Sequence, residues 1–225
     1  MPAMQADLGK YQPPPDVGLN IIYQDDALLI LDKPSGLLSV PGRGAEKQDS
    51  LALRVQARIP DAMIVHRLDM ATSGIMVMAR GREMHRALNR LFQQREIGKR
   101  YIAIVDGRLD PPAGTIRLPL ITDWPNRPRQ KVDHETGKPS ITHYRLLSYQ
   151  PEKECSRVEL VPETGRSHQL RVHMLAIGHV IIGDNLYAGS ACRQQSPRLL
   201  LHACELSLLH PLSGKPMQFQ SEPPF

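Results

Sequence analysis

The chain is built largely of short apolar runs separated by turns, and this pattern limits the fold more than any other feature. The runs are bounded by proline, glycine or clustered polar residues and are rich in Val, Ile, Leu and Tyr, as β-strands are. They lie at 21–24, 27–32, 64–66, 75–80, 101–105, 140–149, 157–162, 199–209 and 217–219. The first two runs, IIYQ and ALLILD, flank Asp25 and Asp26 and predict a β-hairpin.

Helical patterns are few and do not alternate regularly with the strands. One helical pattern, at residues 50–59, begins with Ser50 as a capping residue and stops before Pro60. Residues 82–95 carry apolar side chains at helical spacing, and residues 167–177 end at Gly178. Because a doubly wound parallel sheet needs a regular β-α alternation, we predict an α+β fold with a mixed, mostly antiparallel β-sheet core and flanking helices.

The composition is that of a folded protein that works in water. Apolar residues make up 41% and charged residues 23% of the 225 positions, which is too apolar for a disordered chain. No apolar run approaches the roughly 18 residues of a membrane span, and the N-terminus lacks the order of a secretory signal. We therefore expect a cytoplasmic protein, no membrane partner and a monomer. Residues 1–18 carry three consecutive prolines and predict a flexible tail, whereas residues 19–225 contain no linker and predict a single domain.

No cofactor or metal is indicated by the sequence. The cysteines at 155, 192 and 204 form no CxxC pair, and the nine histidines are scattered. The phosphate-binding patterns GxGxxG and GxxxxGK[ST] do not occur, so no dinucleotide or nucleoside triphosphate is expected. The formal net charge of +5 permits a polyanionic partner without requiring one.

The segment HRLDMATSG at 66–74 contains the best candidate for chemistry. Asp69 lies in a polar turn between two apolar runs, next to Arg67 and the hydroxyl of Thr72. A carboxylate kept ionised by such neighbours can act as a nucleophile or a base. The alternative is a solvated Arg67–Asp69 pair with a turn-forming aspartate, and composition alone favours that alternative.

The same segment resembles a known family. HRLDMATSG fits the HRLDxxTSG signature of the RluA-type RNA pseudouridine synthases at every fixed position, and six further segments similar to that family occur in the chain in the same order as in the family. These are DKPSGLLSVPG at 32–42, KRYIAIV at 99–105, DWPNRPRQK at 123–131, ETGKP at 135–139, TGRSHQLRVHMLAIGH at 164–179 and RLLLHA at 198–203. The resemblance implies one pseudouridine synthase catalytic domain over 19–225, without an extra N-terminal RNA-binding module.

The resemblance implies an isomerase that converts specific uridines of structured RNA to pseudouridine without a cofactor. The WPNRP loop and the short length are most similar to members that act on a tRNA anticodon stem-loop, on 23S rRNA, or on both. The reaction breaks the glycosidic bond, turns the base and rejoins it through a ring carbon. Asp69 would be the catalytic carboxylate, since a fixed anion stabilises positive charge that develops on the sugar.

Three further residues take roles from the resemblance. Arg171 would be the ion partner of Asp69, Tyr101 would stack on the target uracil, and Arg67 would fill the space that the flipped uridine leaves. Each also has a plainer interpretation. A single arginine on a helix is usually exposed, although Arg171 lies in an apolar stretch, and a lone tyrosine is often a core aromatic.

A larger set is expected to bind the RNA, mainly through phosphates. These substrate-binding residues are Arg67, Thr72, Arg127, Arg129, Lys131, Arg166, His168 and Leu170. The arginines of 82–95 are better explained as a solvated helix face. Two alternative functions stay open at this point: a catalytically silent RNA-binding protein, and a glycoside or nucleoside hydrolase, which would need a second carboxylate facing Asp69.

Overall fold

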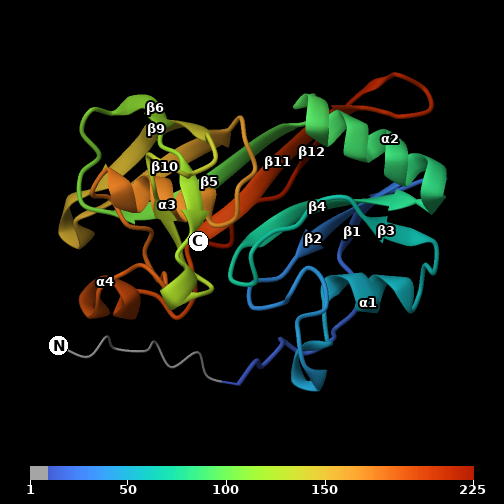
Figure 1. The fold of residues 1–225 in the computed structure, drawn as a ribbon, viewed down its shortest axis with the longest axis horizontal. Coiled ribbons are helices and arrows are strands. Elements are labelled where there is room, and N and C mark those ends of the chain that lie inside the picture. The colour runs from blue at the N-terminus through green and yellow to red at the C-terminus, as the bar shows by residue number, and fades with distance from the viewer. Residues whose placement is uncertain (1–9) are drawn as a thin grey trace. The chain divides into compact units, whose positions relative to one another are not determined.

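The computed structural model describes residues 10–225, which form two units (Figure 1). Unit 1 contains Lys10 and residues 102–201, and unit 2 contains residues 11–101 and 202–225. The chain passes from one unit to the other inside β5 (Gly98–Asp106) and again inside β11 (Leu201–Leu209). No helix in the described part of the chain is long and apolar enough to cross a membrane.

Unit 2 contains a mixed sheet. Its strands run in the order β1, β2, β4 and β11, with β3 paired to β4, β12 paired to β11, and β5 beside β11. Most of these pairs are antiparallel, but β11 runs parallel to β4. Besides β5 and β11, this sheet contains β1 (Ile21–Gln24), β2 (Leu28–Lys33), β3 (Ala62–Ile64), β4 (Ser73–Arg80) and β12 (Pro216–Gln220).

Both faces of β4 are buried, which explains its unbroken apolar sequence. Ile75 and Val77 belong to one buried cluster, together with Leu88 of helix α2 (Gly81–Gln94). Met76 and Met78 point to the other face, into a cluster that includes residues of helix α1 (Leu51–Gln56). The division follows the two-residue period of a strand, so the same run supplies two cores.

The segment before β1 contacts the region of α1. The Tyr11 hydroxyl donates to the carbonyl of Asp49 at 2.9 Å and accepts from the amide of Leu38 at 3.0 Å. Arg54 donates to the carbonyl of Pro14 at 2.6 Å. The flexible tail expected over 1–18 stays a prediction, because these contacts concern its second half and residues 1–9 lie outside the described part.

Unit 1 contains the sheet order β5, β10, β9 and β6, and a separate hairpin of β7 and β8. The pairs β10–β9 and β9–β6 are antiparallel. The helix α3 (Gln169–Ala176) contacts β8 and β9, and α4 (Ser190–Gln194) follows it in the chain. The strands are β6 (Ala113–Arg117), β7 (Leu120–Thr122), β8 (Gln130–Val132), β9 (Ile141–Gln150) and β10 (Cys155–Pro162).

The predicted fold class, α+β with a mixed and mostly antiparallel sheet, is confirmed. The strand expected at 64–66 is placed two residues too late, since β3 ends at Ile64. The helix expected from residue 167 begins at Gln169, because His168 has a left-handed backbone with φ of 54°. Helix α4 and three short 3-10 helices were not predicted; they are η1 (Ala45–Lys47), η2 (Trp124–Asn126) and η3 (Pro151–Lys153). That 19–225 forms a single domain stays a prediction.

Candidate functional site

Asp69 lies in unit 2, in the turn that connects β3 to β4. The amide of Thr72 donates to the carbonyl of Asp69 at 3.1 Å and closes this turn. Leu68 is buried beneath it, Asp69 is partly buried, and Arg67 is exposed. The chain thus anchors the turn through an apolar side chain while it keeps a carboxylate and a guanidinium at the surface.

The segment after β2 holds the backbone on the N-terminal side of Asp69. The Ser39 hydroxyl donates to the carbonyl of Leu68 at 2.7 Å, and the amide of Leu68 donates back to the same hydroxyl at 3.2 Å. Ser39 is itself buried. A reciprocal pair of this kind fixes the residue immediately before the carboxylate.

The same segment holds the C-terminal side through a buried lysine. The ammonium of Lys33, which is fully buried, donates to the carbonyls of Pro34, Leu37 and Met70 at 2.9, 2.8 and 3.1 Å. The amide of Gly36 also donates to Met70 at 2.8 Å. Through these three hydrogen bonds, the ammonium ties residue 70 to the segment 33–39.

The glycine that ends the HRLDMATSG segment allows a close approach of β11. Gly74 has φ of 114°, and a Cβ at this position would collide with the backbone of Ala203. Gly74 and Ala203 are paired in the parallel β4–β11 ladder. Only glycine combines this backbone conformation with this separation, so residue 74 fixes where β4 begins after the turn.

A hydrogen-bonded chain joins the same place to the C-terminal segment. Ser73 is bonded to Nδ1 of His202 at 2.8 Å, and Nε2 of His202 is bonded to Ser221 at 3.0 Å. The Ser221 hydroxyl donates to Asp32 at 2.7 Å. Ser73 and His202 are buried, so this chain rigidifies the start of β4.

Tyr101, on β5, shares the neighbourhood of Asp69 within unit 2. Its ring packs against the cluster that includes Leu68 and Ala203. Burial, and next the negative charge of Asp69, raise the pKa of the Tyr101 phenol. Tyr101 is therefore a neutral phenol near neutral pH, suited to packing and hydrogen bonding.

Arg171 lies in unit 1 on α3 and is paired with an aspartate that the sequence did not single out. Its Nε and Nη2 donate to the two carboxylate oxygens of Asp184 at 2.7 and 2.6 Å. Both side chains are buried, with exposed fractions of 3% and 0%. The amides of Leu186 and Tyr187 also donate to Asp184, so the carboxylate is held from two directions.

Tyr187 connects three of the predicted residues. The guanidinium carbons of Arg171 and Arg129 lie 5.1 and 5.3 Å from the centre of its ring. Its hydroxyl accepts from the amide of Gln130 and is bonded to Nδ1 of His168, both at 2.7 Å. One buried aromatic therefore ties α3 to the loop between β7 and β8.

The loop before α3 is fixed by a glutamine. The side chain of Gln169 accepts from Thr164 at 2.7 Å and from the amide of Arg166 at 3.0 Å, and it donates to the carbonyl of Ile141 at 2.9 Å. Leu170, predicted to touch substrate, is 7% exposed. Within TGRSHQLR, Gln169 thus holds the loop at 164–166 against Ile141 at the start of β9.

The predicted residues divide between the two units. Unit 2 brings together Arg67, Asp69, Thr72 and Tyr101. Unit 1 brings Arg129, His168 and Arg171 around Tyr187. The side chains of Arg127, Lys131 and Arg166 are exposed. The ammonium nitrogen of Lys131 lies 3.6 Å from a carboxylate oxygen of Asp133. The ion pair expected between Asp69 and Arg171 stays a prediction.

Sequence reasoning missed the residues that position the site. Lys33 and Ser39 belong to DKPSGLLSVPG, one of the segments similar to the family, but nothing in the sequence told which atoms they bind. For Arg171, the rule that a buried cation needs an anion indicated a partner. Asp184 and Tyr187 lie in GDNLYA at 183–188, a segment without a recognised pattern.

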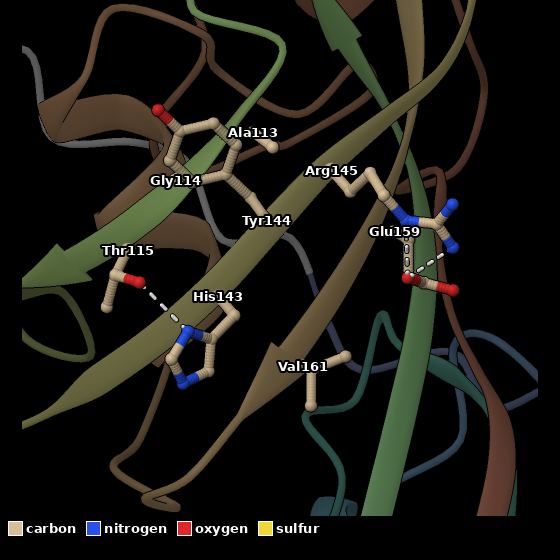
Figure 2. Close-up of a pocket in the computed structure, with 8 residues that line it drawn as sticks. All are labelled: Ala113, Gly114, Thr115, His143, Tyr144, Arg145, Glu159 and Val161. Carbon is tan, nitrogen blue, oxygen red and sulfur yellow. Dashed lines mark hydrogen bonds and ion pairs between the residues drawn. The ribbon is translucent and has the colours of Figure 1, made fainter.

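A shallow pocket of about 470 Å³ lies elsewhere in unit 1, on the strands β6, β9 and β10. Figure 2 shows His143 hydrogen-bonded to Thr115, and Arg145 bonded to Glu159, along its lining. Its eight lining residues include none of the predicted site residues. The pocket is a feature of this sheet and is separate from the residues described above.

Comparison with known proteins finds relatives that match nearly the whole chain. The sequence model of a family described as RNA pseudouridylate synthase matches residues 27–176. The dual-specificity RNA pseudouridine synthase RluA of Escherichia coli K12 is 52% identical over 215 residues, 96% of this chain and 98% of the relative. The protein of that name from Haemophilus influenzae is 48% identical over 216 residues, 96% of this chain and 98% of the relative.

Solved structures resemble the fold over most of the chain. The human RNA pseudouridylate synthase domain containing 1 has a TM-score of 0.78 and 27% identity, covering 95% of this chain and 87% of its own. The human RNA pseudouridylate synthase domain containing 4 has a TM-score of 0.73 and 25% identity, covering 91% and 88%.

Proposed function

Because the chain belongs to the RNA pseudouridylate synthase family, we propose that its substrates are uridines of a tRNA anticodon stem-loop, of 23S rRNA, or of both. The family membership makes the chain an isomerase that turns uridine in RNA into pseudouridine. The observation that carries the choice of substrate is the 52% identity, over nearly the whole chain, to a relative called dual-specificity. We also propose that the protein acts as a monomer in the cytoplasm.

The reaction conserves atoms. The bond between C1′ of the ribose and N1 of uracil breaks, a bond from C1′ to C5 forms, C5 loses a proton, and N1 takes one up. We propose that Asp69 is the catalytic carboxylate of this reaction. Whether it attacks the sugar, attacks the base or abstracts a proton, it must be ionised and held still. The hydrogen bonds from the 33–39 segment to residues 68 and 70 support that assignment.

The other roles follow the chemistry of each side chain. Tyr101, a neutral phenol beside Asp69, stacks on the uracil ring. Arg67, exposed two residues before Asp69, replaces the flipped uridine in the RNA stack. Arg171 is the cation that we assign to Asp69, with its orientation held by Asp184.

One experiment tests the proposal and separates the alternatives. The purified protein is incubated with uridine-labelled transcripts of tRNA and of 23S rRNA fragments, and the nucleosides are then identified. We expect pseudouridine in discrete positions. Free uracil would indicate a hydrolase, and unchanged uridine in RNA that is nonetheless bound would indicate a catalytically silent binding protein.

A further inference from the structure

The loop between β7 and β8 presents a large aromatic side chain to solvent. Trp124 is the single tryptophan of the chain, and 67% of its surface is exposed. Two other aromatic residues of unit 1 differ from it: Tyr187 is 7% exposed and Tyr144 is partly buried. An indole in water leaves a flat apolar surface available to a binding partner.

One face of this indole is already covered by an arginine. The guanidinium carbon of Arg127 lies 3.8 Å from the centre of the Trp124 ring, which is a stacking distance. Arg127 is itself exposed. The two side chains, here called the Trp124–Arg127 pair, thus form a cation–π contact in which most of the indole stays exposed.

The loop holds this pair in place through its own backbone. The amide of Asp123 donates to the carbonyl of Arg129 at 2.9 Å, and the amide of Arg129 donates to the carbonyl of Asn126 at 3.0 Å. The side chain of Asn126 also donates to that of Asp123 at 2.9 Å. At its base, Gln130 is bonded to the buried Tyr187. A loop closed in this way presents the ring at a low entropic cost of binding.

The surroundings of the pair are basic. Arg129 and Lys131 follow within four residues, and half of the Lys131 side chain is exposed. A cationic loop that carries an exposed flat ring combines the two features that bind unpaired nucleotides, phosphate attraction and base stacking.

We propose that the Trp124–Arg127 pair is a stacking platform for one unpaired base of the substrate RNA, a base other than the target uridine. The proposal rests on the proposed function, because it identifies the ligand as RNA. Arg127 then acts through its planar guanidinium and its hold on the indole, rather than as a simple phosphate contact. The pair contributes to recognition of RNA loops by stacking, with little preference among bases.

The single tryptophan makes the test direct. The full-length protein is titrated with an anticodon-type RNA stem-loop while the emission of Trp124 is recorded. Stacking of a base on the indole should quench this emission in a saturable manner. Trp124→Leu should raise the Kd roughly tenfold or more, since loss of one base–aromatic stack typically costs a factor between about five and a hundred and fifty. Trp124→Phe should recover most of the affinity.

Two comparisons separate stacking from charge and from a general surface effect. Arg127→Lys keeps the charge but not the planar stack, so it should weaken binding while leaving the salt dependence unchanged. Leu212→Ala removes another exposed apolar side chain, 61% exposed in unit 2, and should leave the Kd unchanged. Unaltered circular dichroism and thermal melting of each variant establish that it is folded.

Abasic substitutions in the RNA loop identify the partner base. One position should weaken binding to the wild type and have no further effect on Trp124→Leu. The proposal is overturned if emission is unchanged at saturation, if Trp124→Leu binds within about twofold of wild type, or if every abasic position costs both proteins equally. Formation of pseudouridine by the wild type is measured separately, so a failure of the proposed function is distinguished from a failure of the platform.

Discussion

At the scale of single residues, the strongest feature is a carboxylate on a turn whose neighbours are fixed. Asp69 is flanked by Leu68 and Met70, whose backbone groups bind Ser39 and Lys33. The backbone on both sides of the carboxylate is therefore held in place. This is what preorganised stabilisation of a cationic transition state requires, because dipoles and charges that are already oriented need no reorganisation during the reaction.

Asp69→Asn should abolish pseudouridine formation while leaving the fold and RNA affinity nearly unchanged. The amide keeps the shape of the carboxylate and one accepting oxygen but removes its charge. Single-turnover kinetics, with thermal melting and RNA titration as controls, measure the effect. Activity within about tenfold of wild type, roughly 1.4 kcal/mol in the barrier, would show that Asp69 is not the catalytic anion.

A second residue-scale feature is the buried ion pair of Arg171 and Asp184. Asp184→Asn should lower the free energy of unfolding by about 3–5 kcal/mol, because it removes the bidentate carboxylate from a buried guanidinium. Urea unfolding measures this change. The matched control is Glu159→Gln, which breaks the more exposed Arg145–Glu159 pair of the same unit and should cost about 1 kcal/mol or less. Equal losses for the two variants would contradict the importance of burial.

At the scale of elements, the segment 33–39 and the HRLDMATSG segment form one structural piece, although about thirty residues separate them in the chain. Lys33 ends β2, and the next residues turn back to bind the backbone of residues 68–71. Gly74, the second residue of β4, then pairs with Ala203 of β11. The turn that carries Asp69 is thus bound on one side by a loop and on the other by two strands.

Lys33→Met should therefore damage both stability and catalysis. Methionine fills a similar volume but removes the ammonium donor from three carbonyls, of which that of Met70 keeps a second donor, the amide of Gly36. Each carbonyl that stays buried without a donor costs about 1–3 kcal/mol. We expect a thermal melting temperature several degrees lower and a turnover that falls even at temperatures where the variant is folded. Lys47→Met, at an exposed position, is the control. A stable variant with full turnover would show that the turn needs no such support.

At the scale of the whole molecule, the residues that we propose to act on RNA are divided between the two units. Unit 2 contains the residues assigned to the target uridine, Arg67, Asp69 and Tyr101, and unit 1 contains the basic loop with Arg129 and Lys131. Base flipping and phosphate binding are different tasks, and they respond differently to RNA structure and to salt. Variants in the two units should therefore have distinguishable effects.

Arg67→Ala should lose much more activity on an anticodon-type stem-loop than on an unstructured oligonucleotide with the same target. Unstacking costs a few kcal/mol in a structured loop and least in a flexible strand, so only the first substrate needs a side chain to fill the gap. Rate constants on both RNAs measure the difference. Equal proportional losses would refute the flipping role.

The double variant Arg129→Ala, Lys131→Ala should instead weaken binding to both RNAs alike and flatten the dependence of log Kd on log salt, because phosphate contacts release counterions. Titrations of each RNA over a range of salt concentrations provide the measurement. An unchanged salt slope would exclude these side chains as phosphate contacts.

Much of the fold could be predicted because it depends on local pattern. The hairpin of β1 and β2, the helix at 81–94 and the strands of the C-terminal third follow from periodicities of two or 3.6 residues and from turn residues. The family and its chemistry were also readable, since HRLDMATSG and the segments similar to the family are contiguous runs of sequence. The structure confirms these elements, and the comparisons confirm the family.

The sequence by itself determined most of the longer strands and helices, the family, and the carboxylate between two apolar runs. Only the tertiary structure decided which groups meet: that Lys33 binds the carbonyl of Met70, that Asp184 takes the charge of Arg171, and that Arg127 stacks on an exposed Trp124. These contacts depend on how the chain returns on itself. A charged residue in an apolar segment predicts a buried partner, because an unpaired buried charge is costly. Which group becomes that partner depends on the tertiary fold, which brings residues distant in sequence within hydrogen-bond distance.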